Sequence, residues 1–378
     1  MHRSVALPLS LVAAWLFACS QGEVAASSAA QASATDSAND SASAVSSASA
    51  PSATASGLAS ASAPPSATAE PPADPLSADA LMEPVRWMAS PDLHGRRAGT
   101  DDERRVAAHL AKLLDDASIP PAFGVRTQSF DFQSNAETKS SANILALISP
   151  PGGDTKDVVV LGAHYDHLGE RGAEMFPGAE DNASGTSVVL GVARALMRRR
   201  AELGRSVLVV FFGAEEEGLL GSKSFVRTWS FQDHPVTTMV NVDMIGRPLA
   251  DQRGLWWGAH AMGILPDVDP DSAVGVVFSE PLPEDLLTIV RDACKKEKLS
   301  SVALVDLPPS IRQTVAAMTK GRGDDAAFAA NGVKTVFFSS GESDDYHKPT
   351  DTADTLDPTL MATRARAILT TVLAVAKR

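Results

Sequence analysis

The chain of 378 residues has only two cysteines, Cys19 and Cys294. Cys19 belongs to the N-terminal leader described below. Cys294 falls at helical spacing with Leu286 and Val290, so we expect it to be a core residue rather than a nucleophile. No intramolecular disulfide is then expected. With thiolates this scarce, any metal site must be built from histidines and carboxylates.

Basic residues are also fewer than acidic residues. The chain has 33 Lys and Arg against 46 Asp and Glu, which gives a formal net charge of −13. Nucleic-acid-binding proteins need a basic patch, so we expect no nucleic-acid partner. Part of this acidity is what a site for divalent cations requires, because such ions bind carboxylates.

The N-terminus lacks an apolar run long enough to cross a membrane. Residues 1–18 have a basic start, an apolar stretch from Val5 to Phe17 and a small residue, Ala18, before Cys19. This pattern predicts a secretory signal. Residues 16–19 (Leu-Phe-Ala-Cys) resemble the lipobox of bacterial lipoproteins, which implies a signal peptide over 1–18 and a lipid on Cys19.

Residues 19–75 consist almost entirely of Ala, Ser, Pro and Thr. They have too few large apolar side chains to fold, so the sequence predicts a disordered tether. Together with a lipidated Cys19, this predicts an exported protein anchored to a bacterial membrane, with the outer membrane favoured. An ordinary signal peptide with an incidental cysteine, or an uncleaved anchor, is the alternative.

Residues 76–378 predict one large α/β domain. Apolar runs at 158–161, 206–212 and 238–242 are typical of buried strands, and helical patterns cover 184–200 and 218–229. Such alternation predicts a three-layer αβα fold, in which helices cover both faces of a mostly parallel, mixed sheet.

Three successive predicted strands each end at a candidate metal ligand. These are His164, the Glu215–Glu216 pair and Asp243, and Asp181 follows His164 across a Gly-rich loop. Ligands of open α/β sheets bind beyond the carboxyl ends of the strands. Histidines and carboxylates suit a catalytic Zn²⁺ site, and a carboxylate shared by two ions gives a two-metal hydrolytic site.

Two further acidic positions have predicted roles. Glu215 and Glu216 are adjacent, and neighbouring residues that extend a strand point to opposite faces. We therefore expect one of them to be a metal ligand and the other a general base. Asp166, two residues after His164, is expected to hydrogen-bond a ligand and fix its orientation.

Five motifs in this order resemble the M28 family of co-catalytic zinc aminopeptidases. They are GAHYDH (162–167), PGAEDNASG (177–185), AEEEGLLGS (214–222), NVDMIGR (241–247) and YHKPTDT (346–352). LHGRRAGT (93–100) matches the segment with which the family's domain begins. The resemblance covers residues 81–375, and five ligand-bearing motifs together are highly specific.

The resemblance implies two Zn²⁺ ions per chain and a role for each candidate residue. His164, Asp181 and Asp243 would hold one ion, and Asp181, Glu216 and His347 the other. It further implies that Glu215 is the general base and acid, that Asp166 supports the site and that Tyr346 donates to the developing oxyanion. The implied activity is removal of N-terminal residues from peptides with a free N-terminus, through attack by a zinc-bridged hydroxide.

Other functions stay open on the same fold. A single-zinc glutaminyl cyclase or a carboxypeptidase-type relative is one alternative, although the cyclases lack a motif of the form found at 181–185. A non-catalytic binding module is another, but such chains usually lose ligands. A purely structural surface lipoprotein leaves the motifs unexplained.

Several residues near the motifs have less specific patterns. We interpret His167 as a loop residue near the site and not as a ligand. Arg322 and Asp324 either contact substrate or lie in a solvated loop. Trp256 and Trp257, together with Met175 and Phe176, either line a side-chain pocket or belong to the core, and the core is favoured.

Overall fold

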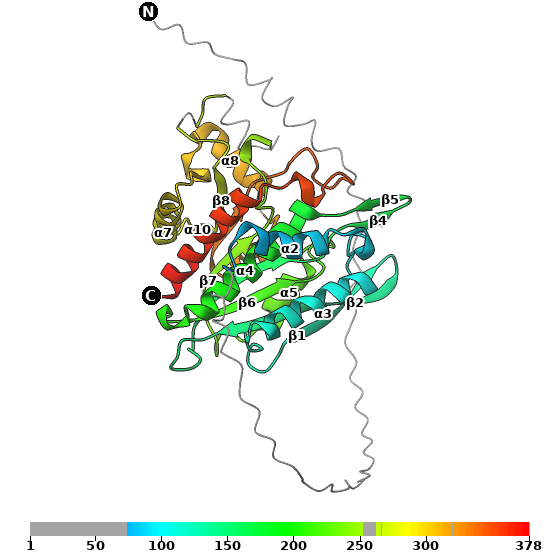
Figure 1. Ribbon diagram of the computed structural model, residues 1–378. Coiled ribbons are helices and arrows are strands. Elements are labelled where there is room, and N and C mark those ends of the chain that lie inside the picture. Colours follow the sequence, from blue (N-terminus) through cyan, green and yellow to red (C-terminus); the bar gives the residue numbers. More distant parts are fainter. Residues whose placement is uncertain (1–73, 252–261, 266, 320, 378) are drawn as a thin grey trace, which may run out of the picture. The chain divides into compact units, whose positions relative to one another are not determined.

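The computed structural model of the protein describes residues 74–251, 262–265, 267–319 and 321–377 (Figure 1). Leu76, near the start of this part, is already buried. Cys19, Trp256 and Trp257 lie outside the described residues, so the expectations about them stay predictions.

An eight-stranded mixed sheet forms the centre of the fold, in the order β1-β2-β6-β3-β7-β10-β8-β9. Strands β6, β3, β7 and β10 run parallel, whereas β1 with β2, β2 with β6, and β10 with β8 are antiparallel. Strand β9 pairs parallel with β8, and β4 and β5 form a separate hairpin. The strands are β1 (Thr127–Ser134), β2 (Glu137–Ile148), β3 (Val158–His164), β4 (Gly169–Arg171), β5 (Glu174–Phe176), β6 (Ser206–Phe212), β7 (Val236–Val242), β8 (Val274–Phe278), β9 (Ser301–Ala303) and β10 (Lys334–Ser339).

The described α-helices connect these strands and frame the sheet. They are α2 (Ala78–Met88), α3 (Asp101–Asp116), α4 (Gly185–Arg198), α5 (Leu220–Thr228), α7 (Glu284–Lys296), α8 (Pro309–Thr319), α9 (Asp325–Ala329) and α10 (Pro358–Ala376). Shorter helical turns are η1 (Pro91–Leu93), η2 (Ala179–Ser184), η3 (Arg200–Glu202), η4 (Leu249–Asp251), η5 (Leu304–Asp306) and η6 (Ala353–Thr355).

The central strands are buried on both faces, which explains their continuous apolar sequences. In β6, Val207, Val209 and Phe211 belong to one core cluster, together with residues of α2, α4 and α10. The alternate residues, such as Val210, pack with Phe225 of α5 on the other face. Figure 1 shows α2, α4 and α10 lying over one face of the sheet. The predicted three-layer architecture is confirmed.

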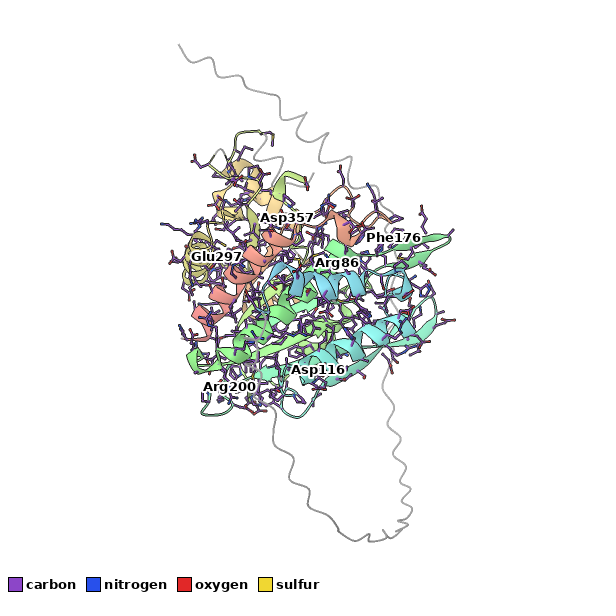
Figure 2. All side chains as sticks on the ribbon, viewed as in Figure 1. Arg86, Asp116, Phe176, Arg200, Glu297 and Asp357 are labelled. Atoms are coloured by element: carbon purple, nitrogen blue, oxygen red, sulfur yellow. The ribbon has the colours of Figure 1, made fainter. Side chains whose placement is uncertain are left out.

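Side chains cap the N-termini of α3 and α10, among other helices. The Thr100 hydroxyl accepts the backbone N–H of Glu103 at the start of α3. The Glu103 carboxylate reaches the N–H of Gly99, one residue before the usual partner in a capping box. Asp357, labelled in Figure 2, accepts two backbone N–H groups at the start of α10.

Helix α10 is long and apolar enough to cross a membrane by length and composition, the one such helix among the described residues. However, 72% of its apolar window is buried inside the fold. Arg364 in its middle is also buried and donates to the carbonyls of Ile245 and Arg247. The helix is therefore part of the core. Cys294 of α7 packs in the same core, as predicted, and burial raises the pKa of its thiol to about 12.

The sequence analysis did not predict several short elements. The stretch after His167, expected to be a Gly-rich loop, contains the β4–β5 hairpin, and residues 299–319 contain β9 and α8. Each of these strands has only three residues. Three residues are too few to show an alternation of apolar and polar positions.

Candidate metal centre

Strands β3, β6 and β7 end at the same edge of the sheet. His164, the last residue of β3, lies opposite Phe212, the last residue of β6, and Gly162 lies opposite Asn241 of β7. The residues that follow these strands therefore meet, as the sequence predicted.

The first cluster consists of His164, Asp181 and Asp243. Nε2 of His164 lies 3.3 Å from Oδ1 of Asp243 and 3.4 Å from Oδ1 of Asp181. All three side chains are buried. Donor atoms on one tetrahedral zinc, each at about 2.0–2.1 Å, lie about 3.3–3.4 Å apart. The spacing of these atoms fits a common ion.

The second cluster uses the other oxygen of Asp181. Its Oδ2 lies 3.1 Å from Nε2 of His347, and the same nitrogen is 3.3 Å from Oε2 of Glu216. Asp181 thus presents one carboxylate oxygen to each cluster, which is the geometry of a bridging ligand. A fourth residue, His167, also contacts this cluster, with Nδ1 2.7 Å from Oε1 of Glu216.

The donor atoms of the second cluster converge without hydrogen-bonding one another. Oε1 of Glu216, Nε2 of His347 and both ring nitrogens of His167 are buried without a hydrogen-bond partner among the described residues. Buried polar atoms are normally paired. Because these unpaired atoms lie close to carboxylate oxygens of the same cluster, the residues that carry them fit a bound cation.

The carboxylates of this cluster also favour positive charge on the groups beside them. Burial would lower the pKa of His347, but Asp181 and Glu216 outweigh it and raise this pKa to about 10. Burial would likewise raise the pKa of Asp181, but His167, His164 and His347 hold it well below its usual range. Histidines and carboxylates together form the donor set that zinc prefers in catalytic sites.

Asn182 ties the start of α4 to the end of β7. Its Oδ1 accepts the N–H groups of Gly185 and Met244, at 2.9 and 3.1 Å, and its Nδ2 donates to the carbonyl of Val242 at 3.0 Å. These bonds hold Asp243, which lies between Val242 and Met244, at a fixed place beside Asp181.

Glu180 and Ser184 hold the loop after Asp243. The Glu180 carboxylate accepts the N–H groups of Gly246 and Arg247, at 2.8 and 3.3 Å. The Ser184 hydroxyl accepts the N–H of Ile245 at 3.0 Å. The polar residues of this motif therefore assemble the backbone around the ligands.

Two buried residues hold Asp181 itself. The Asp351 carboxylate accepts the N–H groups of Glu180 and Asp181, at 2.8 and 3.2 Å. From the other side, the guanidinium of Arg96 donates to the carbonyl of Asp181 at 3.0 Å. Arg96 is completely buried and also donates to the carbonyls of Tyr165, Met88, Pro177 and Gly178.

The Glu215–Glu216 pair lies in a turn after β6 and does not extend the strand, so the argument from strand alternation does not apply. The Asp166 carboxylate shapes this turn by accepting the N–H groups of Glu215 and Glu216, at 2.9 and 3.3 Å. Its Oδ1 also lies 3.7 Å from Nδ1 of His164. Glu216 contacts the second cluster.

Glu215 lies in the field of His164, which lowers its pKa, and of Asp324 and Asp243, which raise it. Burial is the largest effect, and it moves the pKa of Glu215 well above the usual range. A half-buried carboxyl with a raised pKa beside the first cluster suits a group that exchanges protons.

Tyr346 stacks on His347, with ring centroids 3.9 Å apart and an interplanar angle of 21°. Burial, reinforced by Asp181 and Glu216, raises the pKa of its hydroxyl. The phenol therefore stays protonated, as a hydrogen-bond donor must.

Arg322, Asp324 and Phe176, whose sequence patterns were less specific, differ in how far they are buried. Arg322 is exposed and pairs with Glu342. Asp324 is buried, so the solvated-loop interpretation is wrong for this residue. Burial raises its pKa to about 7, although His164 opposes the rise. Phe176, labelled in Figure 2, is buried at the end of β5.

The sequence analysis assigned no role to three residues of this site: Arg96, Glu180 and Asp351. All three lie inside the quoted motifs. Only their membership of these motifs could have indicated a role at the site, because their own partners are mostly backbone groups far away in sequence. His167, interpreted as a loop residue near the site, lies beside the second cluster.

Comparison with known proteins agrees with the geometry. The model of peptidase family M28 matches residues 143–254 and 292–372, about half of the chain. The chain belongs to peptidase family M28. Leucine aminopeptidase 2 of Arthroderma otae is 34% identical to this M28 chain over 159 residues, which are 41% of this chain and 30% of that protein. The chain thus matches less than a third of that relative's length.

Solved structures share the fold of this M28 chain. BSAP, a zinc aminopeptidase from Bacillus subtilis, matches 81% of this chain and 97% of its own, with a TM-score of 0.61 and 16% identity. A glutaminyl cyclase from Porphyromonas gingivalis matches 79% of this chain and 99% of its own, with a TM-score of 0.57 and 18% identity. Since both activities occur on this fold, the choice between them depends on the site.

We expect Arg96→Lys to weaken metal binding. A lysine keeps the buried charge, but one ammonium group cannot reach carbonyls on three sides as the guanidinium does. Loss of such supporting bonds typically lowers metal affinity about 10–100-fold. Zinc retention under competition with a chelator measures this effect. Arg86→Lys, on the exposed side of α2 (Figure 2), is the matched control. Equal zinc retention in the two variants would contradict the role of Arg96.

Proposed function

We propose that this M28 chain is a di-zinc aminopeptidase that removes N-terminal residues from peptides. The observation that carries the proposal is the position of Asp181, which presents one oxygen to each of two donor clusters. Glu215 lies beside the first of them. The similarity to a protein named leucine aminopeptidase 2 supports the same activity.

His164, Asp181 and Asp243 would hold one zinc ion. Asp181, Glu216 and His347 would hold the other, with the distances given above. When bound, the two ions would lower the pKa of a water and polarise the scissile carbonyl.

Glu215 is the proposed general base and acid. Its carboxylate would take a proton from the attacking water and return it to the leaving amine; burial raises its pKa, which favours holding that proton between the two steps. Asp166 orients this step indirectly, because it fixes the turn that carries Glu215. Tyr346, with its proton retained, would donate a hydrogen bond to the developing oxyanion.

The carboxylates at this edge of the sheet supply the negative charge that two divalent cations need. Asp181, Glu216 and Asp243 lie together there, and the pKa of Asp243 is raised by burial.

The alternative functions explain less of the site. A single-zinc glutaminyl cyclase needs one ion, whereas two donor clusters share Asp181. A non-catalytic binding module has no need of Glu215 or of the turn that Asp166 holds in place.

We also propose that the enzyme is exported and anchored by a lipid on Cys19, which makes a membrane its second partner. The support is the sequence of residues 1–19 and the Ala/Ser-rich segment that follows.

We expect Cys19→Ser to release the protein from the membrane fraction of the producing bacterium, because the lipid acceptor is lost. Fractionation with an antibody against the folded domain measures this, and Ser20→Ala is the control. Unchanged membrane association of Cys19→Ser would contradict the anchor.

We expect Glu215→Gln to lower kcat by about 10²–10⁴ while two zinc ions remain bound, because the proton carrier is lost and the ligands are kept. Single-turnover peptide cleavage and metal analysis measure the two effects. Glu137→Gln, on the exposed part of β2, is the matched control. Retained activity in Glu215→Gln would rule out Glu215 as the general base.

A panel of matched peptides tests the substrate class. We expect cleavage of peptides with a free N-terminus and none of their N-acetylated forms, because acetylation removes the positive charge and blocks the amine. Analysis of products by mass spectrometry also detects cyclisation of N-terminal glutamine, the outcome expected of a cyclase. If the zinc-loaded protein acts on no peptide, the enzyme proposal fails.

A further inference from the structure

His167 occupies an unusual position for a loop residue. It is completely buried, and its backbone N–H donates to the carbonyl of Arg96 at 3.3 Å. Its backbone also forms an isolated parallel β-bridge with Arg97. The segment around residues 95–97 therefore fixes His167 just beyond the end of β3, with its ring turned toward the second cluster.

The ring of His167 approaches the same two carboxylates as His347 does. Nδ1 of His167 lies 2.7 Å from Oε1 of Glu216 and 3.7 Å from Oδ2 of Asp181. His347 meets Oε2 of Glu216 and Oδ2 of Asp181 from its own side. The two imidazole rings stand edge to face with their centroids 5.8 Å apart.

These close contacts are not hydrogen bonds. The N–H direction of the His167 ring misses the Glu216 oxygen, so Nδ1 of His167 and Oε1 of Glu216 both lack a partner despite their short separation. A structural histidine in the core would be expected to donate to a carboxylate this close. Donor atoms of His167, Asp181 and Glu216 all lie within 4.8 Å of one another, as ligands of one ion do.

We propose that His167 is a protein ligand of the second metal position, through Nδ1, together with Asp181, Glu216 and His347. This inference rests on the proposed two-zinc function and departs from the ligand set that the family resemblance implies. The first position then has one imidazole and two carboxylates, and the second has two imidazoles and two carboxylates.

With His167 as a ligand, the two metal positions differ in how tightly they bind zinc. Imidazole is a better ligand for zinc than for magnesium, calcium or manganese, which prefer oxygen. With one more imidazole and one more ligand, the second position is the tighter zinc site and fills first. The first position keeps more of its coordination sphere free.

Zinc X-ray absorption on the wild-type, full-length chain tests the ligand count without a variant, because imidazole rings give distinct outer-shell scattering. We expect three histidines shared by two ions. A count of two histidines would overturn the proposal. Since no peptide is present, this result is independent of activity.

His167→Asn should then bind its tighter zinc more weakly by more than about 100-fold, which exceeds the usual cost of losing a residue that only supports a ligand. Its histidine count should fall to two. Chelator competition measures the affinity, and near-ultraviolet circular dichroism of the metal-free protein checks folding. His347→Asn should show a comparable loss, whereas His94→Asn, at an exposed position, should show none.

The outcomes separate this proposal from the proposed function. Two zinc ions held by two histidines, with peptide cleavage, would keep the function and overturn the role of His167. Three histidines without cleavage of any peptide would keep the ligand and overturn the function. Unchanged zinc affinity in folded His167→Asn would also overturn the proposal.

Discussion

The whole site depends on how the backbone of Asp181 is held. Asp351 accepts its N–H and Arg96 donates to its carbonyl, so the residue is fixed from both sides. Burying a guanidinium is costly unless its donors are satisfied and opposite charges lie near. Arg96 meets both conditions, because it donates to five carbonyls and lies in the field of Asp181 and Asp351. This arrangement allows one short carboxylate to serve two clusters.

The fold gives its buried carboxyl groups two different charge states. Burial raises the pKa of Glu103 to about 8 and those of Glu180 and Asp324 to about 7, so these acids carry protons in part or in full near neutral pH. Asp181 is held ionised by the surrounding histidines. Negative charge is thereby concentrated on the bridging position, where a divalent cation needs it, while Glu103 and Glu180 accept hydrogen bonds from groups around the site. This sorting depends on which partners each carboxyl meets in three dimensions.

The sequence was most informative where a local pattern had a direct spatial consequence. Parallel strands end at one edge, so His164, Asp243 and the Glu215–Glu216 pair could be brought together from apolar runs alone. The roles of individual ligands came from the family resemblance. Arg96 could not be found this way, because its partners are carbonyls that carry no sequence signature. The contacts of His167 could not be predicted for a related reason: its position depends on a bridge to Arg97, about 70 residues earlier in the chain. Glu215 also lies in a turn and not in the extended strand that the sequence predicted.

If the two metal positions differ in their number of protein ligands, the general base lies beside the position with fewer ligands. The electric field at Glu215 comes chiefly from His164, Asp324 and the neighbouring carboxylates, including Asp243, so the residue stands beside the first cluster. With His167 as a ligand, the second position is the more saturated one, and open coordination is left at the first. The group that moves protons then faces the position where a water and a substrate carbonyl have room to bind. Strong retention of metal and access for substrate would thus be divided between two positions that share Asp181.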